Sequence, residues 1–487
     1  MFDFLREKEG KILLLLLALQ LLAHLYIGLN WVYQDEENYL TEAWLFSLGR
    51  IPHLDYFSGR PPLFSLYIAP ILLLSNNSML AARLGVSIFS LGTTVLVYLL
   101  ARRLFGNQAG ILSSAIFAIS SFGYLSFMVL QDPLIAFFVV LAFLIFASNE
   151  KGEITKTVAC GLALGLQLAI RQNGAFSIVI MALLLAYTYS RDWKFALKHI
   201  AALALSSVLP LLAILAFYLA LGGLTQFLFN ISLMSGGVLF YISGSLLQYP
   251  VLVPLIALRE FQLFALLIGP WELLKASDPG RKKALLIAVA LSLCGLSALF
   301  PYPVPHHTLL VLPGLALIVS PFLLKINEKA NLQNTVLFGF VFLLLLFLCA
   351  KSSWMVFLGS QETHPFIESN PYSKAANYIS AHTEPGEKIL AYPFVSIYYR
   401  TNRLPGSYYQ IIEEDMANPE VEARIIKEMK EKPTRYFLYL SPTARGQEFF
   451  YKNLSNYVHS KYYVEDAIAG DLDTLFIYRL KNETVNQ

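Results

Sequence analysis

Two adjacent carboxylates and one arginine, all in one polar stretch, are the residues of this sequence whose types and spacing best fit chemistry. Asp35 and Glu36 directly follow a long apolar run, and Arg60 precedes two prolines in the sequence GRPPL. A carboxylate beside hydrocarbon and beside a second acid gains the basicity that a general base needs. A guanidinium presented by a rigid double proline can bind phosphate through two parallel hydrogen bonds. Together these groups predict removal of a proton from a hydroxyl near a bound phosphate.

Each of these groups also has a structural alternative. Asp35 precedes a helix that is predicted over 36–48, so it can serve as an N-cap while Glu36 acts as the base. Arg60 can be an interfacial anchor whose guanidinium extends to lipid headgroups. The helix carries apolar residues on one face and polar residues largely elsewhere, and Gly49 follows it as a stop. We therefore expect an amphipathic helix that lies along the membrane surface.

Other polar side chains stand near the ends of later apolar runs and are weaker candidates for the same site. Arg83 lies in the first turns of an apolar helix, where an arginine is either functional or extends toward water. Asp132 precedes a proline and can cap a helix as readily as it can react. Arg259 has Glu260 as a neighbour that can neutralise it. The full set of additional candidates is Arg83, Arg171 and Arg259 for phosphate binding, and Tyr39, Asp132, His306 and His307 for other roles.

The composition places most of the chain in a membrane. Of its 487 residues, 56% are hydrophobic and only 14% are charged, against roughly 25% charged residues in soluble domains. The formal net charge is +3 and the basic residues are scattered, which excludes a nucleic-acid partner. The three cysteines fall in separate apolar runs and predict no disulfide framework. The adjacent histidines have no neighbouring residues that complete a ligand set, so we predict no metal site there.

Apolar runs of suitable length predict about eleven membrane-spanning helices. A spanning helix needs roughly 20 apolar residues. The run at 63–74 is shorter and contains Pro70, which favours a re-entrant or interfacial helix. The first run has no small-residue cleavage site after it, so we expect it to remain as a membrane helix. The predicted spans are 12–33, 79–101, 109–131, 133–149, 156–171, 174–190, 195–221, 251–274, 284–301, 308–325 and 335–357.

The distribution of Lys and Arg predicts which side of the membrane each loop faces, because cytoplasmic loops carry an excess of both. With the N-terminus in the cytoplasm, most basic residues of the membrane region fall in cytoplasmic segments. The opposite loops hold only Arg50, Arg60 and, at a helix end, Arg171. The polar stretch that contains Asp35 is then an extracytoplasmic loop, and Asp132 and the histidine pair reach the same face. The C-terminal tail is predicted to lie on that side as well.

Composition divides the chain into two parts. Residues 1–358 form the predicted membrane module, and over 359–487 the leucine runs give way to mixed polar sequence. Helical and strand patterns alternate there, which predicts a small soluble extracytoplasmic α/β domain. This part contains no Gly-rich phosphate loop, no metal-spaced cluster and no nucleophile elbow. We expect a lid or a module that positions the acceptor. The helical patterns begin PYSK, VEAR and GQEF, and the strand patterns are EKILAYPF, RYFLYL and TLFIYRL.

The location of the candidate groups restricts the donor. The predicted cytoplasmic loops are too short for a nucleotide-binding domain, and no P-loop or dinucleotide fingerprint occurs. An enzyme that works outside the cytoplasm needs an activated donor that arrives through the membrane, and a polyprenyl-phosphate sugar meets this need. Its transfer requires a base for the acceptor hydroxyl and cations for the departing lipid phosphate. A single displacement with one base predicts inversion at the anomeric carbon.

These motifs resemble a known family. The first-loop pattern DExxY followed by RPPL, the AAR that opens the next helix with VYLLARRLFG at its end, and the QDPL that starts a later helix are similar to motifs of the GT-C class of integral-membrane glycosyltransferases. The likeness is to the branch of the protein O-mannosyltransferases and the lipid A aminoarabinose transferases, glycosyltransferase family 39. It covers the N-terminal third of the chain well and the later helices loosely, as in HHTLLVLPGLAL.

The resemblance implies a GT-C-like fold, a polyprenyl-phosphate sugar donor and an extracytoplasmic site in which Asp35 matches the catalytic aspartate of the family. Arg60 stands where the aminoarabinose branch has Lys, and it would bind the donor phosphate. Gly59 replaces an acid of that branch, so a similar metal site does not carry over. No cofactor is assigned, and a divalent metal is left open. The sugar and the acceptor, whether lipid, glycan or protein, are not specified.

The main alternative is a polytopic transporter or lipid flippase. Such proteins place binding residues near the membrane midplane, often on broken helices in related halves. Here the helix interiors are nearly free of charge, the polar groups gather at one face and no matched halves occur. The sequence therefore favours a glycosyltransferase that works in the cell membrane, with a lipid-linked donor and surrounding membrane lipids.

Overall fold

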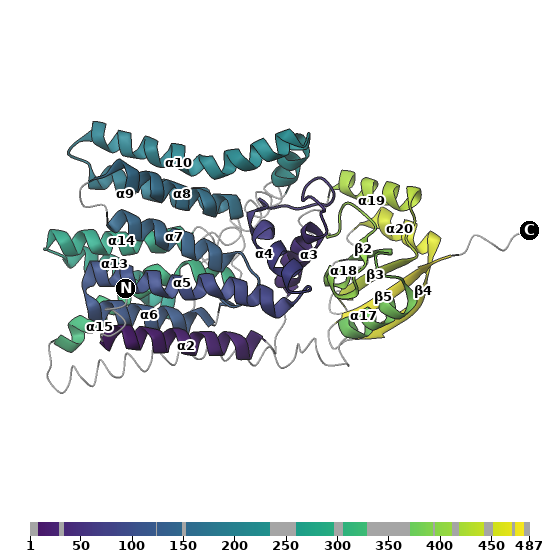
Figure 1. Ribbon diagram of the computed structural model, residues 1–487, viewed down its shortest axis with the longest axis horizontal. Coiled ribbons are helices and arrows are strands. Elements are labelled where there is room, and N and C mark those ends of the chain that lie inside the picture. Colours follow the sequence, from purple (N-terminus) through teal and green to yellow (C-terminus); the bar gives the residue numbers. More distant parts are fainter. Residues whose placement is uncertain are drawn as a thin grey trace, which may run out of the picture.

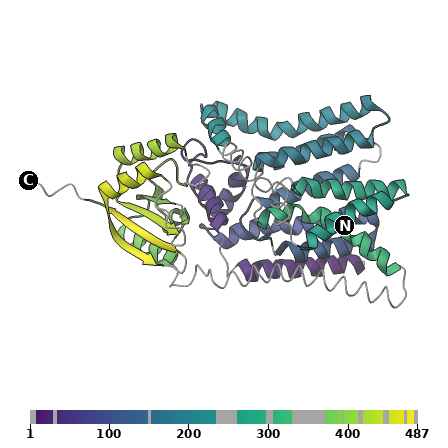
Figure 2. The same ribbon diagram turned by 180° about the vertical axis from the view of Figure 1, so that it is seen from behind.

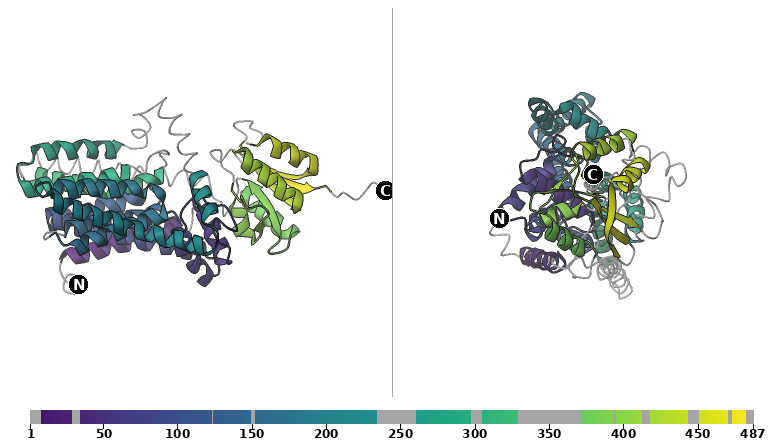
Figure 3. Two further views of the ribbon diagram at one scale, coloured as in Figure 1. Left: turned by 90° about the horizontal axis from the view of Figure 1, so that it is seen from above. Right: turned by 90° about the vertical axis from the view of Figure 1, so that its right-hand side faces the viewer.

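The computed structural model of the protein has a helical bundle and, at one end of it, a smaller domain that contains a β-sheet (Figure 1). The views from behind and from above show the same arrangement (Figures 2 and 3). The residues that the structure describes are 8–28, 34–122, 124–148, 152–233, 260–296, 305–328, 371–392, 395–411, 418–442, 451–469 and 473–481.

Long apolar segments form the bundle. Among the residues that the structure describes, three helical stretches, Lys8–Tyr26, Met79–Phe105 and Trp193–Ala220, are long and apolar enough to cross a bilayer by length and composition. A helix occupies all or part of every predicted span except 335–357, which lies outside the described residues. The bundle helices are α2 (Lys8–Gly28), α5 (Met79–Phe105), α6 (Asn107–Phe122), α7 (Asp132–Ala147), α8 (Ile154–Ile170), α9 (Ala175–Thr188), α10 (Trp193–Ala220), α13 (Glu260–Lys275), α14 (Pro279–Leu296) and α15 (Leu312–Glu328).

The segment after α6 corrects the predicted span 109–131. α6 ends at Phe122, and residues 124–131 form buried turns. The carbonyl of Ser121 accepts from the amides of Tyr124 and Ser126, and the two serine hydroxyls are hydrogen-bonded to each other at 3.2 Å. Serine side chains that bond locally compete with the helical ladder. The apolar run 109–131 has the length of a membrane span, but only its first part is helical. Its second part turns back beneath the first loop.

Two shorter helices follow α2. α3 (Gln34–Ser47) begins one residue before Asp35, so Asp35 lies in its first turn and not at the N-cap position that the sequence allowed. α4 (Leu63–Leu74) has the predicted length and contains Pro70. It packs against α3 and α5. Gly49 lies in the turn two residues after the end of α3 and has a φ of 80°, a left-handed conformation that glycine adopts without strain.

The described part of the C-terminal domain contains a five-stranded sheet with the order β2-β1-β3-β5-β4. β1 pairs in parallel with β2 and β3, whereas β5 pairs antiparallel with β3 and β4. The sequence patterns had predicted three strands. They missed β2, which has two residues, and β4, most of whose side chains are half-buried or exposed, as on an edge strand. The elements are α17 (Pro371–His382), β1 (Lys388–Tyr392), α18 (Ser396–Thr401), β2 (Leu404–Pro405), α19 (Pro419–Glu431), β3 (Tyr436–Pro442), α20 (Lys452–Lys461), β4 (Tyr462–Ala469) and β5 (Asp473–Leu480).

The C-terminal domain packs directly on α3, which lies between the bundle and the sheet (Figure 1). The hydroxyl of Thr41 donates to the carbonyl of Val395 at 3.2 Å, next to α18. One continuous apolar cluster contains Leu40 of α3 and Ile397 of α18. The polar face of α3, which we expected at the membrane surface, is therefore covered by protein. This packing fixes the helix that carries the two candidate carboxylates.

Candidate active site

Glu36 is bound into the bundle. Its carboxylate accepts from Arg83 Nε at 2.7 Å and from Arg83 Nη2 at 2.5 Å, and the amide of Val129 donates to Glu36 Oε1 at 2.9 Å. Both side chains of the pair are buried, at 0% and 3% exposure. Two of the sequence candidates, Glu36 and Arg83, thus neutralise each other, and both sides of the carboxylate are engaged. This arrangement holds the first turn of α3 on α5 and on the turn 124–131.

Glu37 points to the C-terminal domain. It forms an ion pair with Arg400 at the end of α18. Successive residues of an α-helix are rotated by about 100°, so three consecutive acids face three directions. Glu36 contacts the bundle and Glu37 contacts the C-terminal domain. Asp35 faces a further polar cluster.

We expect Glu36→Gln to destabilise the folded protein by about 3–5 kcal/mol, because the Arg83 guanidinium would stay buried without its counter-charge. Glu37→Gln is the matched control, since the side chains of its pair keep 17% and 12% exposure, so water can reach the charge that is left and the loss of stability should be smaller. Thermal unfolding of the two purified variants in detergent compares them. Glu36→Gln with normal stability and lost activity would contradict the structural assignment and return Glu36 to the list of bases.

Asp35 belongs to a cluster around the buried hydroxyl of Tyr39. Burial raises the pKa of Tyr39 to about 12, Arg60 and Arg171 lower it, and Asp132 and Asp35 raise it. All four charged groups therefore lie within electrostatic reach of one phenol. The guanidinium of Arg60 lies over the Tyr39 ring, 4.6 Å from its centroid. The structure thus brings together five of the sequence candidates.

Arg171 and Asp132 enter the cluster from bundle helices. Arg171 directly follows α8, and its Nη1 lies 3.5 Å from Oδ1 of Asp132, the first residue of α7. Asp132 is completely buried, whereas the Arg171 side chain retains 19% exposure. The next residue, Gln172, donates from Nε2 to the carbonyl of Gly59 at 3.5 Å. The loop after α8 thus touches the backbone that carries Arg60.

Three predicted candidates remain, namely His307, His306 and Arg259. Arg259 and the side chain of His306 fall outside the described residues. His307 is buried in the short 3₁₀ helix η3 (Pro305–Leu310), which packs against α7 and α14. No group of three or more metal-ligating side chains occurs among the described residues.

Sequence reasoning missed Glu42, which lies on the same face of α3 as Asp35 and Tyr39. These residues are spaced i, i+4 and i+7, the spacing of one helical face, and this signal could have identified Glu42. Its carboxylate accepts from the hydroxyl of Ser58 at 3.0 Å. Burial raises the pKa of Glu42, and the positive charge of Arg60 opposes this shift. The acid is thus part of the electrostatic surroundings of Arg60.

The backbone of Arg60 is also held by residues that the sequence did not single out. Its carbonyl accepts from His53 Nε2 at 3.1 Å and from the Ser58 hydroxyl at 3.3 Å. His53 is completely buried, and burial lowers the pKa of its imidazole to about 4. The Arg60 guanidinium is therefore presented from a fixed peptide. The arrangement combines a carboxylate with two cations at the junction of the bundle and the C-terminal domain, as transfer from a phosphate requires.

Comparison with known proteins identifies the fold. Residues 59–215 match the family model of the dolichyl-phosphate-mannose-protein mannosyltransferases. No curated protein sequence matches the chain. The structure resembles the archaeal oligosaccharyltransferase AglB from Archaeoglobus fulgidus, solved with an inhibitory peptide and a dolichol-phosphate. The TM-score is 0.59 with 12% identity, and the match covers 90% of this chain and 70% of AglB.

The structure also resembles ArnT from Cupriavidus metallidurans. In the apo state the TM-score is 0.56 with 14% identity, over 95% of this chain and 97% of ArnT. With undecaprenyl phosphate bound the TM-score is 0.55 with 14% identity, over 97% and 98% of the two chains. At such identities the likeness is one of fold. The family match over residues 59–215 and these structures confirm the resemblance to the GT-C membrane glycosyltransferases that the first-loop motif predicted.

Proposed function

We propose that this protein transfers a sugar from a polyprenyl-phosphate donor to a hydroxyl of a lipid, glycan or protein acceptor, with inversion at the anomeric carbon. The observation that carries the proposal is the convergence of Asp35, Arg60 and Arg171 around Tyr39. A site for this reaction needs a base beside a phosphate-binding pair of cations, and these residues supply both. The family match over residues 59–215 and the solved complexes of AglB and ArnT with polyprenyl phosphates support the same donor class.

The three side chains divide the steps of the reaction. Asp35 takes the proton from the acceptor hydroxyl as the oxygen attacks the anomeric carbon. The bond between that carbon and the donor phosphate oxygen breaks, and its electron pair stays on the lipid phosphate. Arg60 and Arg171 stabilise the charge that develops there. Asp132 holds the Arg171 guanidinium from the side of the bundle.

Glu42 belongs to the same electrostatic unit. Its carboxyl group interacts electrostatically with Arg60, and burial raises its pKa while the Arg60 charge lowers it. The described side chains supply every proton transfer in this scheme. Activity measured during titration with a chelator tests whether a divalent metal is required.

A transfer assay in proteoliposomes tests the proposal. The purified protein receives a panel of undecaprenyl-phosphate sugars together with lipid and peptide acceptors, and mass spectrometry follows cleavage of the sugar–phosphate bond. We expect polyprenyl phosphate to copurify and the sugar to move to an acceptor. A transporter or flippase would carry the intact lipid-linked sugar across the bilayer. Movement of intact donor without cleavage would therefore replace this proposal with that alternative.

The proposal places the C-terminal domain and the first loop outside the cytoplasm. The charge pattern supports this orientation: α5 begins beside the C-terminal domain, where the Tyr399 hydroxyl donates to the Asn77 carbonyl, and its last turn carries Arg102 and Arg103. Basic residues are typical of the cytoplasmic ends of membrane helices. The reacting groups then lie on the face to which a lipid-linked donor is delivered.

Thiol labelling in intact cells tests this orientation. We expect a membrane-impermeant maleimide to label Glu384→Cys in the C-terminal domain. Arg191→Cys, in the turn before α10, should be labelled only after the membrane is opened. Both positions are exposed in the structure, so accessibility to the reagent depends on the side of the membrane. The reverse labelling pattern would place Asp35 in the cytoplasm and remove the proposed donor.

A further inference from the structure

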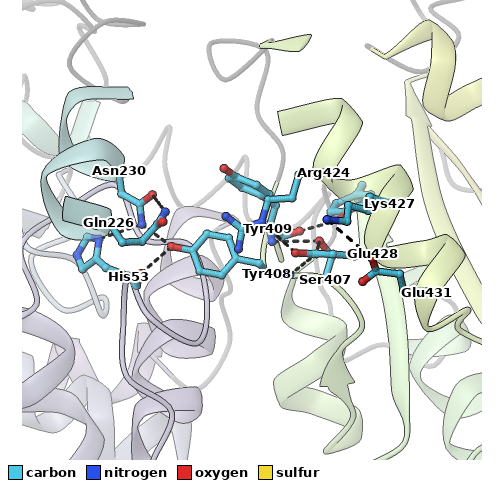
Figure 4. A network of polar contacts seen from close by, with 11 residues as sticks. His53, Gln226, Asn230, Ser407, Tyr408, Tyr409, Arg424, Lys427, Glu428 and Glu431 are labelled. Carbon is cyan, nitrogen blue, oxygen red and sulfur yellow. Dashed lines mark hydrogen bonds and ion pairs between the residues drawn. The ribbon is translucent and has the colours of Figure 1, made fainter. Parts of the chain in front are cut away.

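A short segment of the C-terminal domain is bound to the loop that presents Arg60 (Figure 4). The amide of Phe57 donates to the carbonyl of Tyr408 at 2.8 Å, and Gln410 Nε2 donates to the carbonyl of Phe57 at 2.7 Å. The Tyr408 hydroxyl donates to the carbonyl of His53 at 2.8 Å. Both the backbone and the side chain of Tyr408 therefore bind the first loop.

A third element completes this contact. Asn230, in the helix Leu224–Leu233 after α10, donates from Nδ2 to the Tyr408 hydroxyl at 2.6 Å and lies 3.3 Å from His53 Nδ1. The side-chain oxygen of Asn230, Oδ1, accepts from Gln226 Nε2 at 3.0 Å. Figure 4 shows these side chains in one network that joins the two parts of the molecule. Asn230 and His53 are both completely buried, so the contacts of Asn230 with His53 and with the Tyr408 hydroxyl are protected from water.

The partners of His53 fix its tautomer. The Arg60 carbonyl can only accept, so Nε2 of His53 carries the hydrogen and donates. Nδ1 then accepts from the Asn230 amide. Burial lowers the pKa of His53 to about 4, so the ring is neutral at physiological pH. The imidazole is thus a neutral bridge between Asn230 and the peptide of Arg60, with both ring nitrogens engaged.

The other side of Tyr408 is fixed by α19. The Arg424 guanidinium lies 4.0 Å from the centre of the Tyr408 ring, and Arg424 Nε donates to Glu428 Oε1 at 3.0 Å. The second oxygen of Glu428 accepts from the Tyr408 amide at 2.9 Å and from the Ser407 hydroxyl at 2.7 Å. Tyr408 therefore enters the first loop from a rigid support, and its position follows that of the whole C-terminal domain.

We propose that Tyr408 and His53 are positioning residues of the donor site, through which the C-terminal domain sets the placement of Arg60. The path of contacts runs from Glu428 to Tyr408, from Tyr408 to His53, and from His53 to the Arg60 carbonyl. This inference rests on the proposed function, because it assigns Arg60 to the donor phosphate. It also gives the C-terminal domain a role beyond that of a lid. The position of the domain and the affinity for the donor are therefore coupled. The factor by which a change of domain position alters the donor affinity is the factor by which bound donor shifts the equilibrium between the domain positions.

Tyr408→Phe tests the inference, because it removes one hydroxyl and keeps the ring. We expect the KM for an undecaprenyl-phosphate sugar to rise roughly tenfold, as the loss of a buried hydrogen bond implies, while kcat at saturating donor changes less than about twofold. Tyr462→Phe is the matched control, since its buried hydroxyl donates to the Thr434 carbonyl inside the same domain at 2.9 Å. It should lower stability to a similar degree without changing the KM. Equal KM values in the two variants would overturn the inference.

A double-mutant cycle separates positioning from general damage. If Tyr408 acts through Arg60, Tyr408→Phe has no further effect on the KM once Arg60→Ala is present. Additive effects would overturn the inference.

Hydrogen–deuterium exchange of residues 53–60 provides a readout that needs no donor. We expect faster exchange in Tyr408→Phe than in Tyr462→Phe, and unchanged exchange would count against the contact path. Wild-type protein that neither binds nor cleaves the donor would overturn the proposed function instead, while faster exchange in Tyr408→Phe would still support control of the loop by the domain.

Discussion

Asp35→Asn is expected to lower sugar transfer by about 10²- to 10⁴-fold, the range over which general acid–base catalysis operates. The substituted amide has nearly the shape of the carboxylate but cannot take a proton from the acceptor hydroxyl. Asp35 is the acid of its helical turn whose charge acts on Tyr39, whereas Glu36 and Glu37 form ion pairs with Arg83 and Arg400. Affinity for the donor should change little, because the phosphate-binding role falls to Arg60 and Arg171. Initial rates at saturating donor, together with binding of undecaprenyl phosphate, measure the two quantities separately.

Asp55→Asn is the matched control for this substitution. Asp55 lies in the same loop, is exposed, and accepts from the Ile51 amide at 2.7 Å. This variant should retain normal sugar transfer. That result would show that the loss of a negative charge in the loop is not sufficient to abolish activity. Full activity of Asp35→Asn would remove the assignment of the base. If Asp132→Asn abolished transfer in that case, the proton would go to the buried carboxylate of α7.

Much of the site could be predicted from sequence because membrane helices bring their ends to common faces. Asp35, Arg60, Asp132 and Arg171 are far apart in the chain, but the predicted spans placed all of them at the same face, and the structure gathers them around Tyr39. The predicted helix over 36–48 and the short helix at 63–74 also occur, as α3 and α4. These predictions depend on run length, helix periodicity and helix-breaking residues, which are local properties of the sequence.

The distinction between Asp35 and Glu36 could not be made from sequence. It depends on Arg83 and on the amide of Val129, which reach Glu36 from separate segments of the chain. The Val129 amide is available only because α6 ends at Phe122 and the chain turns back. A run of apolar residues does not show where a helix stops when serines bond locally within it.

The contact of the C-terminal domain with the first loop could not be predicted from the sequence either. Tyr408 is one of several tyrosines in a polar region, and His53 stood in a loop without a motif. Their hydrogen bond joins residues that are 355 positions apart in the chain. Long-range pairing of this kind leaves no periodic signal, so only the packing of α18 and α19 identifies which tyrosine reaches the site.

Arg60→Ala is expected to weaken binding of the donor by roughly 10- to 100-fold, because hydrogen bonds to a charged group contribute about 1.5–3 kcal/mol. The Arg60 guanidinium lies over Tyr39, and its peptide is held by His53 and Ser58. The fall in transfer should appear mainly as a higher KM for the donor. Arg50→Ala is the matched control, because Arg50 is an exposed arginine of the same loop. Titration of the purified variants with undecaprenyl phosphate gives the affinities directly.

Arg60→Lys distinguishes phosphate binding from membrane anchoring. A lysine keeps the positive charge and can extend to lipid headgroups as an arginine does, but it lacks the planar pair of donors that binds two phosphate oxygens at once. If Arg60 binds the donor phosphate, the affinity of the lysine variant lies between those of the wild type and the alanine variant. If Arg60 only anchors the loop, lysine restores donor affinity completely and alanine lowers it no more than Arg50→Ala does. The order of the three affinities therefore depends on whether the guanidinium binds one phosphate group or the membrane surface as a whole.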